Sequence, residues 1–187
     1  VNTTAWVGLT SSSIARTLVD YYLGIPAAKA SLNITATTTT TGVGATTATA
    51  DRTTVIAGEI YSASVYVEAV STPVTVKMGL RFYNIGGTLI SETLNLSPKV
   101  VSANNAWTRL SVTGAQVPVG ATKMGFVIYS TSTMTAGQVY RIDGVLMEKS
   151  STLGDYFDGS TSLGTTVWTG TAHSSTSTFN MSSSYYV

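Results

Sequence analysis

The sequence predicts an all-β fold, a two-sheet antiparallel jelly-roll sandwich, on three observations. Apolar and polar residues alternate with a period of two over several segments, which is typical of strands with one buried face. Turns that contain glycine or proline separate these segments, and none of them shows the period of an amphipathic helix. Threonine, which fits a pleated sheet, is abundant, whereas charged residues make up only 10% of the chain.

The alternating segments give the expected strands. The clearest runs over residues 61–69, and residues 74–82 repeat its pattern after a turn at Pro73. Glycines in Asn84-Ile-Gly-Gly87 can adopt positive φ, so residues 88–96 should pair antiparallel with residues 76–83 as a hairpin. Further strands are expected at 14–19, 30–36, 53–56, 107–113, 123–130 and 139–148, and the threonine run at 37–42 is expected to be a loop or an exposed edge.

Length and composition predict one domain with an appendage. We expect a jelly roll over residues 1–159 and a serine- and threonine-rich C-terminal hairpin or arm over residues 160–187, packed on the domain or on a neighbouring subunit. The chain begins at Val1, so we expect a fragment or processed segment of a longer protein. A net charge of +1 does not indicate the basic surface that nucleic-acid binding requires. No apolar run reaches the roughly 20 residues needed for membrane insertion. The absence of cysteine excludes disulfides and cysteine-ligated zinc.

A candidate carbohydrate-binding face lies opposite the expected core. Its residues are Tyr66, Glu68, Lys77, Arg81 and Tyr83, which we expect on two neighbouring strands. Sugar binding needs a flat aromatic ring and planar polar groups, which these residue types supply. The alternative is that they form ordinary cross-strand pairs, each stabilising the sheet by roughly 0.2–1 kcal/mol, on a solvated or oligomer-buried surface.

No motif predicts catalysis, so we expect a non-enzymatic protein. The single histidine, His173, lies in a serine- and threonine-rich segment, and the Gly-x-Ser-x-Gly motif of a serine nucleophile is missing. We interpret His173 and Trp168 as interface residues. Asp155 and Asp158 could form the carboxylate pair of a glycosidase, but Asp158 followed by glycine is more typical of a turn.

Four segments carry a resemblance to a known family. Residues 58–68, 79–83, 107–114 and 140–148 resemble jelly-roll carbohydrate-binding modules of the kind grouped with xylanase and cellulase modules. The closing segments, Asp155-Tyr-Phe-Asp-Gly159 and residues 168–178, resemble the ends of such modules in tail and other structural proteins of phages that infect Gram-positive and actinobacterial hosts. In modules of this family that hold a structural calcium, an acidic N-terminal segment and an aspartate in the last strand bind it. Asp143 matches that aspartate and is the candidate ligand, but no acidic residue precedes Asp20, so no cofactor is expected.

The resemblance implies a role on the outside of a phage virion. It implies a minor tail or tail-tip module for adsorption to host cell-wall glycan or for assembly with other virion proteins, as a homo-oligomer such as a trimer. One alternative is a purely structural capsid or tail decoration protein that binds only virion proteins. A second alternative is an ancillary carbohydrate-binding module of a secreted glycoside hydrolase.

Overall fold

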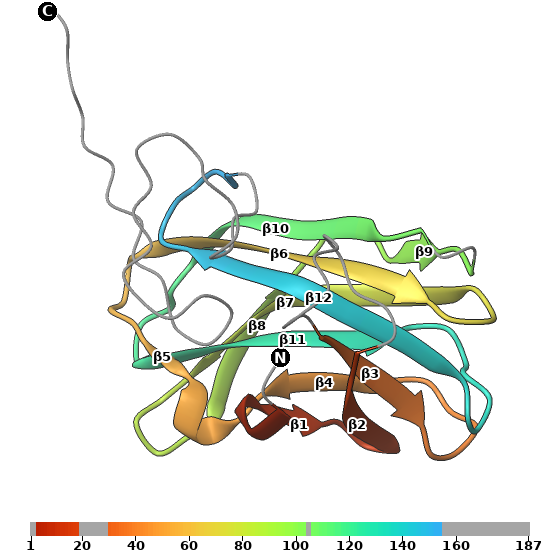
Figure 1. The fold of residues 1–187 in the computed structure, drawn as a ribbon. Helices are drawn as coiled ribbons and strands as arrows, with labels where there is room; N and C mark the ends of the chain where they lie inside the picture. Colours follow the sequence, from red (N-terminus) through yellow and green to blue (C-terminus); the bar gives the residue numbers. More distant parts are fainter. Residues whose placement is uncertain (1–2, 19–29, 104–105, 155–187) are drawn as a thin grey trace, which may run out of the picture.

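The protein is an all-β sandwich of two antiparallel sheets in a computed structural model that describes residues 3–18, 30–103 and 106–154 (Figure 1). The seven-stranded sheet has the order β1-β4-β11-β7-β8, with β5 also paired to β11 and β9 to β7. The five-stranded sheet has the order β10-β6-β12-β3-β2. This arrangement confirms the predicted fold class. The boundary at residue 159 and the expected arm lie outside the described residues.

The strands have the following bounds. The seven-stranded sheet contains β1 (Trp6–Gly8), β4 (Gly44–Thr47), β5 (Thr53–Thr54), β7 (Val74–Tyr83), β8 (Leu89–Leu94), β9 (Lys99–Val101) and β11 (Lys123–Ser130). The five-stranded sheet contains β2 (Ser12–Thr17), β3 (Ser31–Ala36), β6 (Ile60–Ala69), β10 (Thr108–Gln116) and β12 (Val139–Glu148). Two short 3-10 turns, η1 (Thr3–Ala5) and η2 (Thr49–Asp51), complete the described elements. None of the helical segments within these ranges is long and apolar enough to span a bilayer.

The predicted hairpin between β7 and β8 is confirmed. Gly87 has a φ of +83° and donates its backbone N–H to the Asn84 carbonyl, while the Asn84 side chain accepts the N–H of Thr88. Strand β4 was not predicted, because its sequence of glycine, alanine and two threonines lacks large apolar residues at alternate positions. It nevertheless lies inside the seven-stranded sheet, between β1 and β11.

The two strands with the clearest alternation lie in different sheets, which corrects the prediction that they are neighbours. β6 belongs to the five-stranded sheet and β7 to the seven-stranded sheet. The alternating apolar residues of both strands belong to the core, and the chain between the strands crosses the sandwich, so these residues meet across the core. A period of two identifies the buried side of a strand but not its hydrogen-bonded partner.

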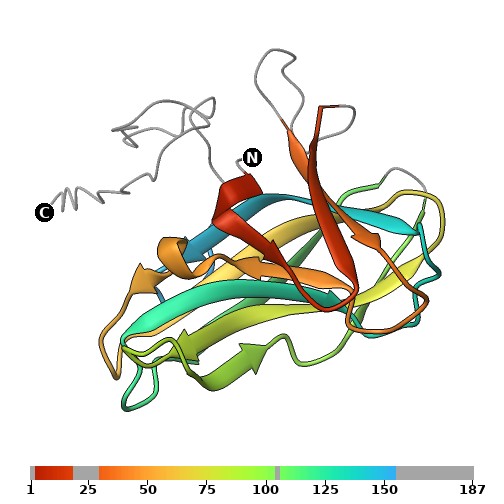
Figure 2. The same cartoon turned by 90° about the horizontal axis from the view of Figure 1, so that it is seen from below.

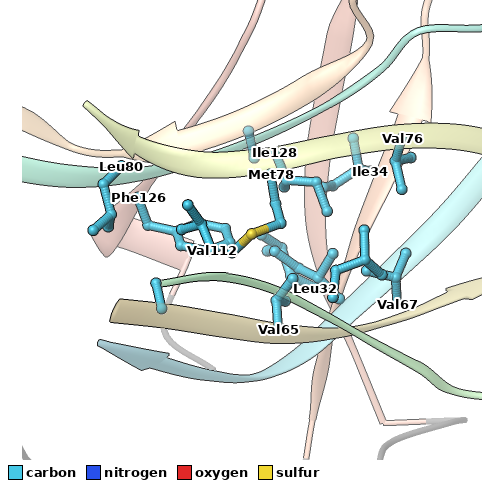
Figure 3. Close-up of a cluster of buried hydrophobic side chains, with 14 of the residues drawn as sticks. Leu32, Ile34, Val65, Val67, Val76, Met78, Leu80, Val112, Phe126 and Ile128 are labelled. Carbon is cyan, nitrogen blue, oxygen red and sulfur yellow. The ribbon is translucent and has the colours of Figure 1, made fainter. Parts of the chain in front are cut away.

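The core fills the space between the sheets (Figure 3). Met78, Phe126 and Ile128 of the seven-stranded sheet face side chains such as Leu32 and Val65 of the five-stranded sheet, and each of these five is at most 1% exposed. Burial of apolar surface contributes roughly 25 cal/mol per Å² to stability, so a continuous core of this kind supplies the main force that holds the sheets together.

Two bulges interrupt the strands on either side of β6. The register of β10 shifts between Val112 and Ala115, where Gly114 has a φ of +68°, and that of β12 shifts between Asp143 and Leu146, where Gly144 has a φ of +56°. Each bulge inserts an extra residue and reverses the alternation beyond it. The alternation of β12 therefore changes faces partway along the strand.

Candidate functional site

The five residues predicted to bind sugar divide between two surfaces. Tyr66 and Glu68 lie on the outer face of the five-stranded sheet, whereas Lys77, Arg81 and Tyr83 lie on the outer face of the seven-stranded sheet. These faces point in opposite directions because β6 and β7 oppose each other across the core. The structure therefore does not bring the five residues into one groove, and each face has to be considered separately.

On the five-stranded sheet, charged groups are bound to one another. The Arg141 guanidinium lies 3.2 Å from the carboxylate of Glu68, and the Glu68 side chain is fully buried. Arg141 Nε also donates a hydrogen bond to Asn33 Oδ1 at 3.1 Å. These three residues come from neighbouring strands, β12, β6 and β3. These interactions link the three strands on the outer face of the five-stranded sheet.

The protein's own chain covers part of the same face. Ser62 Oγ donates to the Ser150 carbonyl at 2.8 Å, and Arg109 Nη2 donates to the Gly154 carbonyl at 2.7 Å. Arg109 also donates from Nε and Nη2 to Ser64 Oγ, both at 3.1 Å. Residues 150–154 are therefore held against β6 and β10, and Arg109 Nε and Nη2 make three hydrogen bonds within the molecule.

On the seven-stranded sheet, four half-buried side chains come from three adjacent strands, β11, β7 and β8. Figure 2 shows these strands side by side in the sheet. We name Lys77, Arg81, Glu92 and Tyr129 the polar cluster. Lys77 of β7 is the cross-strand partner of Tyr129 of β11, and Arg81 of β7 is the partner of Glu92 of β8. Arg81 Nε lies 2.8 Å from Glu92 Oε1. Tyr129 and Glu92 were missed in the sequence, because only the cross-strand register places them beside Lys77 and Arg81.

The chemistry of the polar cluster suits a ligand rich in hydroxyl groups. Burial raises the pKa of the Tyr129 hydroxyl, the negative charge of Glu92 raises it further, and Arg81 opposes them. The phenol therefore stays protonated at neutral pH, where it can both donate and accept a hydrogen bond. The Glu92 carboxylate supplies planar acceptors beside the guanidinium donors of Arg81.

Two glycines near the polar cluster let the backbone of neighbouring strands approach closely. A Cβ at Gly79 would lie 2.1 Å from the Thr93 carbonyl oxygen and 2.9 Å from Leu94 Cδ2. A Cβ at Gly44 would lie 2.1 Å from the Ile128 carbonyl oxygen and 2.7 Å from Tyr129 Cβ. The space that side chains would need at these two positions is already occupied by the neighbouring strands, which explains the small residues there.

Tyr83 does not present a free ring. The Arg52 guanidinium carbon lies 3.4 Å from the centre of the Tyr83 ring, and Tyr83 is only 5% exposed. This geometry is that of a cation–π contact. A sugar could stack on this face of Tyr83 only if Arg52 moved, which leaves Tyr129 as the accessible aromatic residue of the polar cluster.

The remaining predicted sites are the calcium candidate Asp143 and the interface residues Trp168 and His173. In the described part of the chain, no three or more histidine, cysteine, aspartate or glutamate side chains gather as a metal site would require. Asp143 Oδ1 instead accepts the backbone N–H of Gly144 at 2.8 Å. Trp168 and His173 lie outside the described residues.

Comparison with known proteins finds solved structures that are similar to this chain. No protein-family model matches the sequence. Curated proteins give no match either. Among solved structures, the CBM22-1 xylan-binding domain of Paenibacillus barcinonensis Xyn10C superposes with a TM-score of 0.59 at 20% identity, covering 81% of this chain and 89% of that one.

Two further matches come from Clostridium thermocellum Xyn10B. Its C-terminal family 22 carbohydrate-binding module gives a TM-score of 0.59 at 19% identity, with coverage of 82% and 91%. The CBM22-1 and GH10 modules of its xylanase, in complex with xylohexaose, give 0.57 at 16% identity, covering 79% of this chain and 26% of that one. At these identities the matches establish a shared fold, the jelly-roll sandwich of carbohydrate-binding modules.

Proposed function

We propose that this chain is a non-enzymatic carbohydrate-binding module that holds a glycan on the outer face of the seven-stranded sheet. The observation that carries the proposal is the polar cluster, in which Tyr129 lies beside Lys77 and the Arg81–Glu92 ion pair on three adjacent strands. A sugar packs its C–H face on an aromatic ring and exchanges hydrogen bonds with planar charged groups. The fold shared with xylan-binding modules supports this assignment.

The seven-stranded sheet is preferred to the five-stranded sheet for two reasons. On the five-stranded sheet, Glu68 is fully buried in its ion pair with Arg141, and residues 150–154 lie against the strands. On the seven-stranded sheet, the side chains of Arg81 and Glu92 are 20% and 23% exposed, so solvent and ligand can reach them.

For the biological setting, the proposal is an outward-facing module of a phage virion that adsorbs to host cell-wall glycan. The resemblance of the closing segments to phage tail proteins supports this setting. The proposal includes assembly with other virion proteins and a homo-oligomeric state such as a trimer. An ancillary module of a secreted glycoside hydrolase agrees equally well with the fold, because the matching Xyn10B structure joins such a module to a GH10 module. Neighbouring genes separate the two settings, and light scattering of the full chain measures the oligomeric state.

The test is affinity electrophoresis of the full chain through gels that contain soluble polysaccharides, including xylan and host cell-wall polysaccharide. Retardation by one or more polymers is expected. Tyr129→Ala should weaken it by about tenfold or more, the effect of losing roughly 1.4 kcal/mol of binding free energy.

Tyr66→Ala, which removes a tyrosine from the opposite face, is the matched variant. It should leave the retardation unchanged. Loss of binding in Tyr66→Ala but not in Tyr129→Ala would move the site to the five-stranded sheet. Absence of retardation in every polymer, with the chain folded, would contradict glycan binding and favour a purely structural virion protein.

A further inference from the structure

Charges are distributed unevenly between the two outer faces. The chain has 10 basic and 9 acidic residues, so its net charge shows no preference for an anion. Four of the basic residues, Arg52, Lys77, Arg81 and Lys123, lie on or against the outer face of the seven-stranded sheet. The acidic side chain paired with them is Glu92. On the five-stranded sheet, by contrast, Arg141 is paired with the buried Glu68.

Three of these cations surround Tyr83, and we name Arg52, Arg81 and Lys123 the basic cluster. Arg52 stacks on the Tyr83 ring. Lys123 is the cross-strand partner of Tyr83, which places the two Cβ atoms about 5 Å apart. Arg81 precedes Tyr83 by two residues on the same face of β7, a separation of about 7 Å along the strand.

Two members of the basic cluster have only neutral partners. Lys123 Nζ donates to Thr54 Oγ1 at 2.7 Å, and Arg52 Nη1 lies 3.5 Å from the Gly87 carbonyl oxygen. Within residues 3–18, 30–103 and 106–154, neither has an acidic side chain in ion-pair contact, although Asp51 adjoins Arg52 in the sequence. The guanidinium stacks on the Tyr83 ring, and its Nε is buried with no hydrogen-bond partner among the described residues. An anion that bridged Arg52 and Lys123 would neutralise two charges that the described residues leave unbalanced.

We propose that the glycan held on this face is anionic, with a carboxylate or phosphate group bound between Arg52 and Lys123. This inference rests on the proposed function and names the ligand class of the same site. Arginine is suited to such groups because its planar fork matches two oxygens of a carboxylate or phosphate. Lys77 lies about 13 Å from Arg81 along β7, so a second charge on a polymer with a repeated acidic group would have a cation to contact.

A glycan explains this face better than a nucleic acid does. Single-stranded nucleic acids stack successive bases on open aromatic rings. Here the Tyr83 ring is covered by Arg52, and Tyr129 is the half-buried aromatic residue of the polar cluster. One ring beside several hydrogen-bonding groups suits a sugar that carries acidic substituents.

The experiment measures binding of the full chain by calorimetry to matched pairs of polymers. Polygalacturonate and its carboxyl-reduced form have the same backbone and differ in charge, and a polyglycerol-phosphate teichoic acid tests phosphate as the source of charge. We expect an acidic polymer to bind at least about tenfold more tightly than its neutral counterpart. The difference should shrink as salt rises from about 50 mM to about 500 mM, because salt screens exposed charges.

Substitutions assign the effect to the basic cluster. Lys123→Gln and Arg52→Gln should each weaken binding to the acidic polymer severalfold. Arg16→Gln, which removes an exposed cation from β2 of the other sheet, should not weaken it. Because Arg52 packs on Tyr83, its variant is used only if its melting temperature matches that of the parent chain. Lys123→Gln, at a side chain whose ammonium group donates to a threonine hydroxyl, provides the independent variant.

The outcomes separate the two proposals. Equal binding of the neutral and acidic polymers, with Lys123→Gln behaving as Arg16→Gln does, would overturn the anionic ligand but retain glycan binding. Failure to bind any polymer would overturn both proposals. Binding of an oligothymidylate as tight as that of the acidic glycan, with the same dependence on Lys123, would overturn the assignment to a carbohydrate.

Discussion

The Tyr140 hydroxyl donates a hydrogen bond to the Val43 carbonyl oxygen, 3.0 Å away. Tyr140 belongs to β12 of the five-stranded sheet, and Val43 directly precedes β4 of the seven-stranded sheet, so the bond crosses the sandwich. The tyrosine is fully buried, and this burial raises the pKa of its hydroxyl. The same carbonyl also accepts the backbone N–H of Ser130 at 2.8 Å. The entry of the chain into β4 is therefore fixed by one hydrogen bond from each sheet.

Tyr140→Phe should lower the free energy of unfolding by about 0.5–1.5 kcal/mol. The ring still fills its place in the core, but the Val43 carbonyl loses one of its two donors. Chemical denaturation measures the change. Tyr129→Phe, which removes a hydroxyl from the half-buried outer surface, is the control and should change stability by less than about 0.5 kcal/mol. Equal stability of the Tyr140→Phe protein and the parent chain would show that the bond across the sandwich contributes nothing net.

The two ion pairs on the outer faces should differ strongly in their contribution to stability. Glu68→Ala leaves the Arg141 guanidinium, which is 13% exposed, without its buried carboxylate, and should cost about 3–5 kcal/mol. Glu92→Ala breaks the more exposed pair with Arg81 and should cost no more than about 1 kcal/mol. Urea denaturation of both variants gives the comparison. Similar losses in the two would contradict the difference in burial on which the prediction rests.

Gly79 should tolerate no side chain. Gly79→Ala places a Cβ against the backbone of β8 and should lower the free energy of unfolding by roughly 1–3 kcal/mol. Gly86→Ala is the matched control, because the nearest atom to a Cβ there is the Asn84 side-chain oxygen at 3.4 Å. Thermal unfolding of both variants tests this. A Gly79→Ala protein as stable as Gly86→Ala would mean that β8 moves away at little cost.

Acid should destabilise the fold through Glu59. Its carboxylate accepts hydrogen bonds from the side chain of Lys149, the backbone N–H of Ile56 and the hydroxyl of Tyr61. The Lys149 bond is the largest cause, and together these contacts lower the Glu59 pKa from 4.5 to about 2. Because the folded pKa lies below the unfolded value, the ionised group stabilises the fold above pH 4.5, and this contribution is lost as pH falls toward 2.

Melting temperatures of the parent chain and of Glu59→Gln between pH 6 and pH 2 measure this contribution. The parent chain should lose stability more steeply than Glu59→Gln below pH 4.5. Parallel curves across that window would assign the acid sensitivity to other carboxylates.

Local sequence patterns predicted most strands and the hairpin of β7 and β8, but not which sheet each of the other strands joins. Alternation at residues 61–69 and 74–82 identified β6 and β7, because burying one face of a strand imposes a period of two. Which sheet each strand joins depends on contacts between distant parts of the chain. Strand β4 is short and made of small residues, so its sequence shows no alternating pattern. Its place inside the sheet depends on pairing with β1 and β11, which the local sequence does not indicate.

The sequence predicted only part of the candidate site, because the rest depends on how distant strands pair. Lys77 and Arg81 were identified because they alternate with the buried residues of their own strand. Tyr129 and Glu92 join them only through the register of β11 and β8. Tyr83 was judged available to a sugar, but Arg52, far from it in the sequence, covers the ring.

The two bulges beside β6 separate positions that shape the fold from those of the proposed site. Beyond Gly144, Leu146 pairs with Ser64 on the outer side, while Met147 pairs with Ala63 and packs against the core. Gly114 and Gly144 occupy a backbone conformation that L-residues adopt at a cost, and neither belongs to the polar or the basic cluster. Substitutions in either cluster can therefore accumulate without disturbing the two bulges, which depend on these glycines. The backbone that sets the alternation of β10 and β12 is thus specified separately from the side chains of the proposed site.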